Sequence, residues 1–292
     1  MGQEQSRFLV ETTWLAEHLH DPHLRIVDMR GYVRSIEKNG VQDALYVGAR
    51  DEYEQGHIPG SLYVDWSRDI VDPDDSVEAQ VASPQRFADV MGRLGIGDQH
   101  LVVAYDQHPT SQFATRLWWA LNYYGHREVV VLNGGLAKWK REGLPLDTLQ
   151  PSYPPAVFTP VVQPQLRATA QEVLALLRTE GVTLVDARDR GQYTGEVVRG
   201  EGRRGHIPGA ISLPREEVID ERTGTFRSKE ELRTLFTSAG IVPQERVVAY
   251  CNGGVAATTI LFTLAMLGYP ELTNYDGSWN EWGKRQDLPI EV

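Results

Sequence analysis

Cysteine is almost absent from this chain, since its 292 residues contain a single one, Cys251. One cysteine cannot form an internal disulfide, and a reducing compartment fits such a protein best. The sequence also lacks an N-terminal secretory signal and any apolar run that approaches the ~20 residues of a transmembrane helix. We therefore expect a cytoplasmic protein.

Positive charge is also scarce, because the chain has 29 Lys and Arg residues but 40 Asp and Glu residues, which gives a net charge of -11. This charge repels phosphate backbones and anionic lipid, so nucleic acid and membrane surfaces are not expected as partners. Residues 1–6 match the bare myristoylation pattern, but no basic cluster follows, and we interpret the match as chance. The composition is otherwise that of a globular protein, and ~150 residues per domain predicts two domains.

Cys251 lies between two apolar runs that predict a strand, a loop and a helix. The first run is Arg246 to Tyr250, and the second extends to Gly268. Between them the glycines allow the backbone to curl, so that successive N–H groups and the positive end of the helix dipole can hold an anion. Such a position favours a thiolate, although a small buried side chain at a strand end is the commoner fate of a lone cysteine. The candidate cradle around the nucleophile Cys251 consists of Asn252, Gly253, Gly254, Val255, Ala256 and Ala257.

The first half of the chain repeats these landmarks in the same order. Leu101 to Asp106 parallels Val247 to Cys251, with Asp106 in the place of the cysteine. Val-Asp-x-Arg occurs at 27–30 and 185–188, and Gly-His-Ile-Pro-Gly at 56–60 and 205–209. Because the same motifs recur in the same order in both halves, the sequence predicts that one fold occurs twice. Alternating helical runs and short apolar runs predict an α/β protein with a mainly parallel, helix-flanked sheet in each half.

Proline concentrates between the two halves, where little periodicity is present. We expect an extended, fairly stiff linker that lets two domains pack face to face, with the cysteine loop open to the cleft between them. The predicted organisation is an N-terminal domain over residues 1–144, a proline-rich linker over 145–167 and a C-terminal catalytic domain over 168–292. The prolines concerned are Pro145, Pro151, Pro154, Pro155, Pro160 and Pro164.

Three motifs together carry a resemblance to a known family: the paired Gly-His-Ile-Pro-Gly elements, the cysteine loop after Val-Val-Ala-Tyr, and the run from Asp276 to Trp282. From about residue 8 to its end, the chain resembles the tandem-domain rhodanese family of thiosulfate and 3-mercaptopyruvate sulfurtransferases. The resemblance implies two rhodanese-like domains, the first non-catalytic. It also implies a persulfide on Cys251, formed from a small anionic sulfur donor and passed to a thiol or cyanide, with no metal and no organic cofactor.

The donor-binding residues depart from the family pattern. Thiosulfate enzymes of the family resemble Cys-Arg-Lys-Gly-Val-Thr and mercaptopyruvate enzymes resemble Cys-Gly-Ser-Gly-Val-Thr, whereas here Gly253 and Ala256 replace the distinctive residue and the threonine. A family arginine that binds donor falls at Gln192, while Arg199, seven residues before His206, is retained. Arg188 and Arg199 are thus the candidate donor-binding cations. Without a cation at position 253, we expect a modest preference for mercaptopyruvate over thiosulfate.

Several alternatives stay open at this point. Arg30 matches Arg188 in the first half, so Arg188 could instead form an ion pair with a carboxylate. His57 and His206 occur in both halves, which favours a structural role in the turn over catalysis. A cysteine phosphatase would need an arginine six residues after the cysteine, where this chain has Ala257. A sulfur carrier that delivers persulfide to a protein partner is the alternative to an enzyme.

Overall fold

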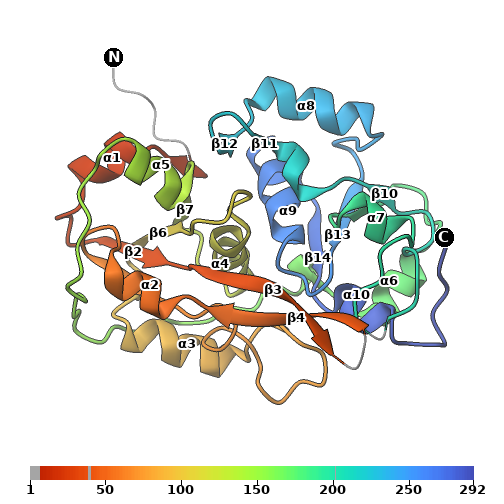
Figure 1. Ribbon diagram of the computed structural model, residues 1–292, viewed down its shortest axis with the longest axis horizontal. Helices are drawn as coiled ribbons and strands as arrows, with labels where there is room; N and C mark the ends of the chain where they lie inside the picture. Colours follow the sequence, from red (N-terminus) through yellow and green to blue (C-terminus); the bar gives the residue numbers. More distant parts are fainter. Residues whose placement is uncertain (1–6, 39–40, 201) are drawn as a thin grey trace.

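Each half of the protein contains one five-stranded, fully parallel sheet (Figure 1). The computed structural model describes residues 7–38, 41–200 and 202–292, so the myristoylation pattern lies outside the described residues. The N-terminal sheet has the order β1-β7-β6-β2-β5, and the C-terminal sheet has the matching order β8-β14-β13-β9-β10. The predicted α/β class and the repeat are therefore confirmed. The strands are β1 Leu9–Val10, β7 Val129–Leu132, β6 Leu101–Tyr105, β2 Leu24–Asp28, β5 Ser61–Tyr63, β8 Arg167–Ala168, β14 Leu272–Tyr275, β13 Arg246–Tyr250, β9 Val182–Asp186 and β10 Ile211–Ser212.

The helices flank the sheets, and their ends follow capping signals in the sequence. α3 starts with Pro84 after the N-cap Ser83, and α8 starts after the capping box of Ser228 and Glu231. No helix of the described residues is long and apolar enough to cross a membrane. The helices are α1 Thr12–Glu17, α2 Arg50–Gln55, α3 Pro84–Arg93, α4 Gln112–Tyr123, α5 Gly135–Arg141, α6 Ala170–Leu176, α7 Arg190–Tyr193, α8 Lys229–Ser238, α9 Ala257–Met266 and α10 Ser278–Trp282, with short 3₁₀ turns η1 Pro164–Leu166 and η2 Arg215–Val218.

Two antiparallel hairpins were not expected from the sequence. The larger one pairs β3 Gly31–Lys38 with β4 Val41–Gly48, and it extends from the N-terminal half toward α10 of the other half (Figure 1). The smaller one pairs β11 Ile219–Asp220 with β12 Thr225–Phe226. The larger hairpin contacts the C-terminal half through the Gly200 N–H, which donates to the Gln42 carbonyl at 2.6 Å. It therefore brings N-terminal residues to the edge of the second sheet.

The two halves share one hydrophobic core because α4 and α9 pack side by side. The rings of Trp118 and Phe262 meet edge to face with centroids 5.1 Å apart, and Thr115 Oγ1 lies 3.0 Å from Thr258 Oγ1. Helix and strand are absent from the described chain over 148–163, within the predicted linker. The boundaries 1–144, 145–167 and 168–292 remain a prediction.

A buried ion pair joins the halves beside this helix pair. Arg116 on α4 donates to Asp276 Oδ1 at 2.6 Å, and the two side chains are 1% and 0% exposed. The second carboxylate oxygen of Asp276 accepts from the Val81 N–H at 2.9 Å and lies 3.2 Å from Arg167 Nε. Arg116 also donates to the carbonyl of Gly254. The ion pair therefore connects both domains to the loop that follows Cys251.

We expect Asp276→Asn to lower the free energy of unfolding by about 3 kcal/mol, because loss of one partner leaves the buried Arg116 guanidinium uncompensated. Urea unfolding of the variant and the wild type measures the change. Glu54→Gln is the control, since Glu54 pairs with Arg50 on the surface of α2 at 50% and 55% exposure, and such exposed pairs contribute about 0.5 kcal/mol or less. Equal stability losses in the two variants would contradict the assigned importance of the pair.

Candidate active site

Cys251 directly follows β13, and a neighbouring turn holds its backbone in place. The Cys251 N–H donates to Ser278 Oγ at 3.1 Å, and its carbonyl accepts from the Trp279 N–H at 3.0 Å. The Asn252 carbonyl accepts from the Asn280 N–H at 2.8 Å. Cys251 itself is a free cysteine, 3% exposed. The start of α10 and the beginning of the cysteine loop are thus fixed to each other.

The loop from Asn252 to Ala256 keeps its N–H groups free and uses its carbonyls for support. Within the described part of the chain, these five N–H groups have no hydrogen-bond acceptor. The Gly254 carbonyl, in contrast, accepts from Arg116 and from Asn274 Nδ2, and the Val255 carbonyl accepts from Thr258 Oγ1. Unpaired N–H groups next to a helix N-terminus form an anion-binding concavity. Ala257 opens α9 and is fully buried.

Only one of the two loop glycines needs a left-handed backbone. Gly254 has φ +69°, and a Cβ added there would lie 2.7 Å from the Asp276 carbonyl oxygen. Gly253 lies outside the left-handed region, and a Cβ added to it would meet Asn280 Nδ2, the Tyr46 hydroxyl and Ala79 Cβ at 3.1–3.3 Å. Gly254 therefore shapes the loop, whereas Gly253 allows the N-terminal hairpin to approach it.

The N-terminal half has an anion at the equivalent place. Asp106 follows β6 as Cys251 follows β13, and its carboxylate accepts N–H groups from His108, Phe113 and Ala114 at 2.8–2.9 Å. Asp106 is 1% exposed, and burial raises the pKa of its carboxyl to about 7, against the effect of these hydrogen bonds. One loop type thus holds an internal carboxylate in the first half and leaves its N–H groups unpaired in the second.

A pocket of about 350 Å³ opens in front of Cys251, and both domains line it. Of the residues proposed for the site, Asn252, Gly253, Val255, Ala256 and Arg199 line it together with Cys251. Gln192 lies in the wall, where its Oε1 accepts from Asn252 Nδ2 at 3.1 Å. The N-terminal half contributes residues that the sequence did not indicate: Tyr32, Tyr46, Trp66, His108 and Gln112.

Tyr46 of the N-terminal hairpin lies beside the loop, where its hydroxyl would be 3.2 Å from a Cβ added at Gly253. Its hydroxyl accepts from Asn280 Nδ2 at 3.0 Å, its ring meets Trp66 edge to face, and the guanidinium of Arg199 lies 5.5 Å from the ring centroid. Burial raises the pKa of the Tyr46 hydroxyl, so it stays protonated at neutral pH. The sequence signal that could have found it is Asn39-Gly40 between two alternating runs, which is typical of a hairpin turn.

Two arginines present buried nitrogen atoms without partners to this region. Arg199 Nη2 and Arg215 Nε are fully buried and have no hydrogen-bond partner among the described residues. Both side chains line the pocket. Burying an unpaired donor costs about 1–3 kcal/mol unless a ligand satisfies it. The two guanidinium groups are therefore available for an anion in the pocket.

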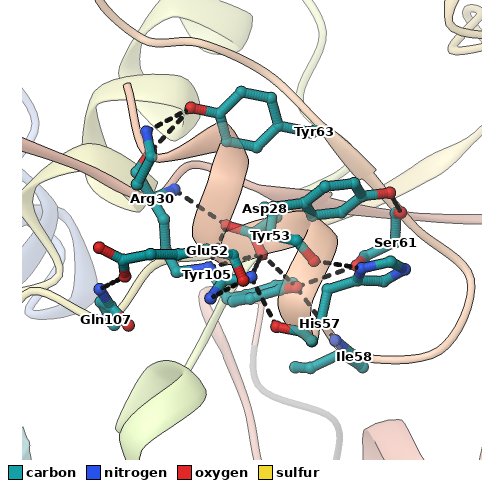
Figure 2. A network of polar contacts seen from close by, with 12 residues as sticks. Asp28, Arg30, Glu52, Tyr53, His57, Ile58, Ser61, Tyr63, Tyr105 and Gln107 are labelled. Carbon is teal, nitrogen blue, oxygen red and sulfur yellow. Dashed lines mark hydrogen bonds and ion pairs between the residues drawn. The ribbon is translucent and has the colours of Figure 1, made fainter. Parts of the chain in front are cut away.

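Arg188 requires a correction, because the structure does not place it where a donor could reach it. It is 2% exposed, its Nη2 lies 2.6 Å from Asp186 Oδ2, and it donates to the Gly205 carbonyl at 2.8 Å. Arg188 does not line the pocket. Arg30 forms the same pair with Asp28 in the first half, within the polar network of Figure 2. The ion pair is thus a repeated feature of the fold that connects a strand end to the following turn.

The paired histidines also belong to the repeated scaffold. His57 stacks on Tyr53 with ring centroids 3.9 Å apart, and His206 stacks on Tyr193 at 3.7 Å. In each case Nδ1 is hydrogen-bonded to the backbone carbonyl of the stacked tyrosine, as Figure 2 shows for the first copy. Neither histidine lines the pocket, which supports the structural interpretation.

Among the described residues, no group of three or more His, Cys, Asp or Glu side chains is arranged to hold a metal ion. The chemistry that these residues themselves can carry out is nucleophilic attack by Cys251 and stabilisation of negative charge by the loop. A sulfur anion formed at Cys251 would meet unpaired N–H groups rather than a metal.

Comparison with known proteins shows the family to which this chain belongs. The Rhodanese-like domain model matches residues 11–142 and again 169–285, so the chain belongs to the rhodanese family. The sulfur carrier protein TtuD of Thermus thermophilus is 37% identical, with 99% of this chain and 98% of its own length aligned. The thiosulfate sulfurtransferase of Rattus norvegicus is 36% identical over 96% of this chain and 93% of its own.

A solved structure extends the likeness to the fold. The crystal structure of SseA from Escherichia coli, described as a 3-mercaptopyruvate sulfotransferase, has a TM-score of 0.81 and 31% identity over 94% of this chain and 99% of its own. The predictions of a tandem rhodanese protein and of a sulfurtransferase enzyme are thereby confirmed. The names of these relatives differ in the sulfur donor, since one gives thiosulfate and another 3-mercaptopyruvate.

We expect Gly254→Ala to abolish most sulfur transfer and to destabilise the protein by more than about 2 kcal/mol, because it adds a clash with the Asp276 carbonyl to the cost of a left-handed alanine. Gly268→Ala is a matched control, since Gly268 has φ +86° and nothing within 4 Å of an added Cβ. The control should lose about 1 kcal/mol and keep its activity. Urea unfolding and steady-state rates test both variants, and an active, stable Gly254→Ala protein would disprove the role given to this loop.

Proposed function

We propose that this protein moves a sulfane sulfur from 3-mercaptopyruvate or thiosulfate to a thiol or cyanide acceptor through a persulfide on Cys251. One observation carries the proposal: the N–H groups of residues 252–256, beside the only cysteine, have no partner among the described residues, whereas the matching loop in the first half holds the carboxylate of Asp106. The loop that binds an internal anion in one half is thus free to bind a sulfur anion in the other.

The first half-reaction forms the persulfide. The Cys251 thiolate attacks the outer sulfur of the donor, and a new sulfur–sulfur bond forms. With thiosulfate, the donor's sulfur–sulfur bond breaks and sulfite leaves with its electron pair. With mercaptopyruvate, the carbon–sulfur bond breaks and pyruvate leaves as its enolate, which then takes up a proton. The terminal sulfur of the persulfide is negatively charged when deprotonated, and the loop N–H groups can stabilise that charge.

The second half-reaction regenerates the thiolate. A thiol or cyanide nucleophile attacks the outer sulfur, the bond between the two sulfurs breaks, and its electron pair returns to Cys251. The absence of a second cysteine from the sequence supports this order, because no internal thiol can attack the persulfide first. The reaction alternates between two enzyme forms and needs no metal or organic cofactor. A cytoplasmic location remains a prediction from the single cysteine.

The donor is held by the pocket, and Arg199 is the proposed partner of its anionic group. Arg199 lines the pocket and has a buried nitrogen without a partner in the described chain. Mercaptopyruvate has one carboxylate, which one guanidinium can bind in a bidentate manner. The uncharged loop at Gly253 favours this singly charged donor over thiosulfate.

A sulfur carrier is the second candidate function, and its support is the 37% identity to the sulfur carrier protein TtuD. A carrier would form the same persulfide but release sulfur only to a protein partner. Repeated turnover with cyanide separates the two functions, since a carrier would be loaded once and then stop. Turnover with a small acceptor would favour the enzyme.

We expect Cys251→Ser to abolish sulfur transfer from both donors while leaving the fold intact, because serine matches the size of cysteine but cannot form a persulfide. Intact-mass measurement after incubation with each donor should show one added sulfur on the wild type and none on the variant. Thermal unfolding of both proteins checks the fold. A variant that transfers sulfur at a comparable rate would refute the persulfide mechanism.

The first domain is proposed to be non-catalytic. A variant with its single cysteine at position 106 instead of 251 tests whether the first loop can accept sulfur. We expect the double variant Cys251→Ser, Asp106→Cys to acquire no sulfur from either donor, because position 106 is buried and does not line the pocket. The variant retains one thiol, so a thiol count on unfolded protein confirms its composition. One sulfur added to the folded double variant would show that the first loop is accessible to donor.

A further inference from the structure

The loop after Cys251 contributes no full positive charge to the pocket. Residues 252–257 are uncharged, and Arg188 is occupied by Asp186. The N–H groups and the dipole of α9 supply only partial charge. A doubly charged donor such as thiosulfate therefore needs a cation from elsewhere in the structure.

Arg215 is placed to provide it. Its backbone N–H donates to the Ala187 carbonyl at 3.3 Å, which fixes the start of η2 beside the end of β9. Its Nη2 lies 2.8 Å from Glu216 Oε1, and its side chain is 18% exposed. Its Nε is buried without a partner among the described residues. One part of the guanidinium is thus balanced by Glu216, and another remains unsatisfied in the wall of the pocket.

His108 lies in the same pocket and does not carry a competing charge. Burial, with a smaller effect from Arg215, lowers the pKa of His108 to about 4, so the imidazole is neutral at pH 7. The Thr110 N–H donates to its Nδ1 at 3.2 Å, which leaves the proton on Nε2. The neutral imidazole therefore has an N–H donor to offer and does not repel Arg215.

Two acidic residues, Asp43 and Asp189, line the pocket together with the two arginines. Asp43 Oδ1 accepts the N–H of Ala44 at 2.8 Å, and Asp189 is exposed to solvent at the start of α7. Arg199 and Arg215, in contrast, each have a fully buried nitrogen with no partner in the described chain. Buried charges act over short distances with less screening than exposed ones. The two arginines therefore offer an anion in the pocket two buried nitrogens that no described residue satisfies.

We propose that Arg215 binds the sulfonate group of a doubly charged sulfur donor such as thiosulfate and replaces the cation that the cysteine loop lacks. The inference rests on the proposed sulfur transfer and refines its donor range. Arg199 serves singly and doubly charged donors alike, whereas Arg215 becomes important only when the donor carries a second charge. Thiosulfate is thus a substrate of this pocket despite the glycine at position 253.

Steady-state kinetics of Arg215→Gln with both donors tests the proposal. We expect kcat/KM for thiosulfate to fall about ten-fold, the equivalent of ~1.4 kcal/mol, mainly through a higher KM. For mercaptopyruvate we expect a loss of less than about three-fold, because its single carboxylate does not need the second cation. Arg215→Lys should recover most of the thiosulfate rate, since it restores the charge.

Two controls show whether the effect of Arg215→Gln comes from the charge lost in the pocket. One tests for an effect of the protein's overall charge, and the other tests for a loss of stability. Arg222→Gln removes one positive charge at an 87% exposed side chain in the turn between β11 and β12, and it should leave both donors unaffected. Thermal unfolding of all variants checks the fold. Equal losses for both donors in a folded Arg215→Gln protein, or no recovery in Arg215→Lys, would overturn the proposal.

A binding measurement distinguishes this inference from the proposed function. Calorimetric titration of thiosulfate into Cys251→Ser, with and without Arg215→Gln, reports binding without chemistry. We expect the affinity to fall about ten-fold when Arg215 is replaced. Unchanged affinity would refute the role of Arg215 even if the wild type transfers sulfur. Conversely, an Arg215-dependent affinity in a protein that never forms a persulfide would refute the sulfur transfer alone.

Discussion

The contact between Arg116 and Asp276 is the interaction on which the site depends. Both side chains are buried, so the pair is stable only while the two domains stay together, and each partner holds part of the cysteine loop. Arg116 donates to the Gly254 carbonyl, and the backbone of Asp276 lies where any side chain at Gly254 would be. Arg116 and Asn274 thus hold the loop through the Gly254 carbonyl, while no described residue accepts from the loop N–H groups. The interdomain ion pair therefore helps to keep those N–H groups available for a ligand.

The loop that follows the third strand of each sheet, β6 or β13, differs between the two halves in the residue at its start. In the first, Asp106 supplies the anion, and its three N–H contacts complete the loop without a ligand. In the second, Cys251 has no carboxylate, so the loop remains incomplete until a sulfur anion forms. The exchange of one residue at a strand end thus separates the first loop from the loop proposed to be reactive, while the Asp–Arg pair and the stacked histidine are present in both.

Local sequence predicted much of the fold and is the basis for proposing Cys251 as the reactive residue, but it did not indicate the walls of the pocket. The strands, the helix caps and the repeat follow from short-range patterns, and Cys251 follows from its place between a strand and a glycine loop. Arg188 was misassigned because its partner, Asp186, satisfies it through a bidentate geometry that sequence alone does not reveal. Arg215 and His108 could not be found, because their nearness results from the packing of residues from different domains. Tyr46 could have been found, since Asn39-Gly40 indicates a hairpin.

Insertions at different points of the two copies explain why the pocket needs both domains. In the first half the extra chain lies between Arg30 and α2 and forms the β3–β4 hairpin, whereas in the second it lies between α7 and His206 and contains Arg199. The two insertions meet where Gly200 donates to Gln42 and where Arg199 faces Tyr46. Each copy alone would leave its loop open to water, which weakens the attraction between an arginine and an anion. The N-terminal copy, which has no cysteine of its own, thus supplies one wall of the pocket in front of Cys251.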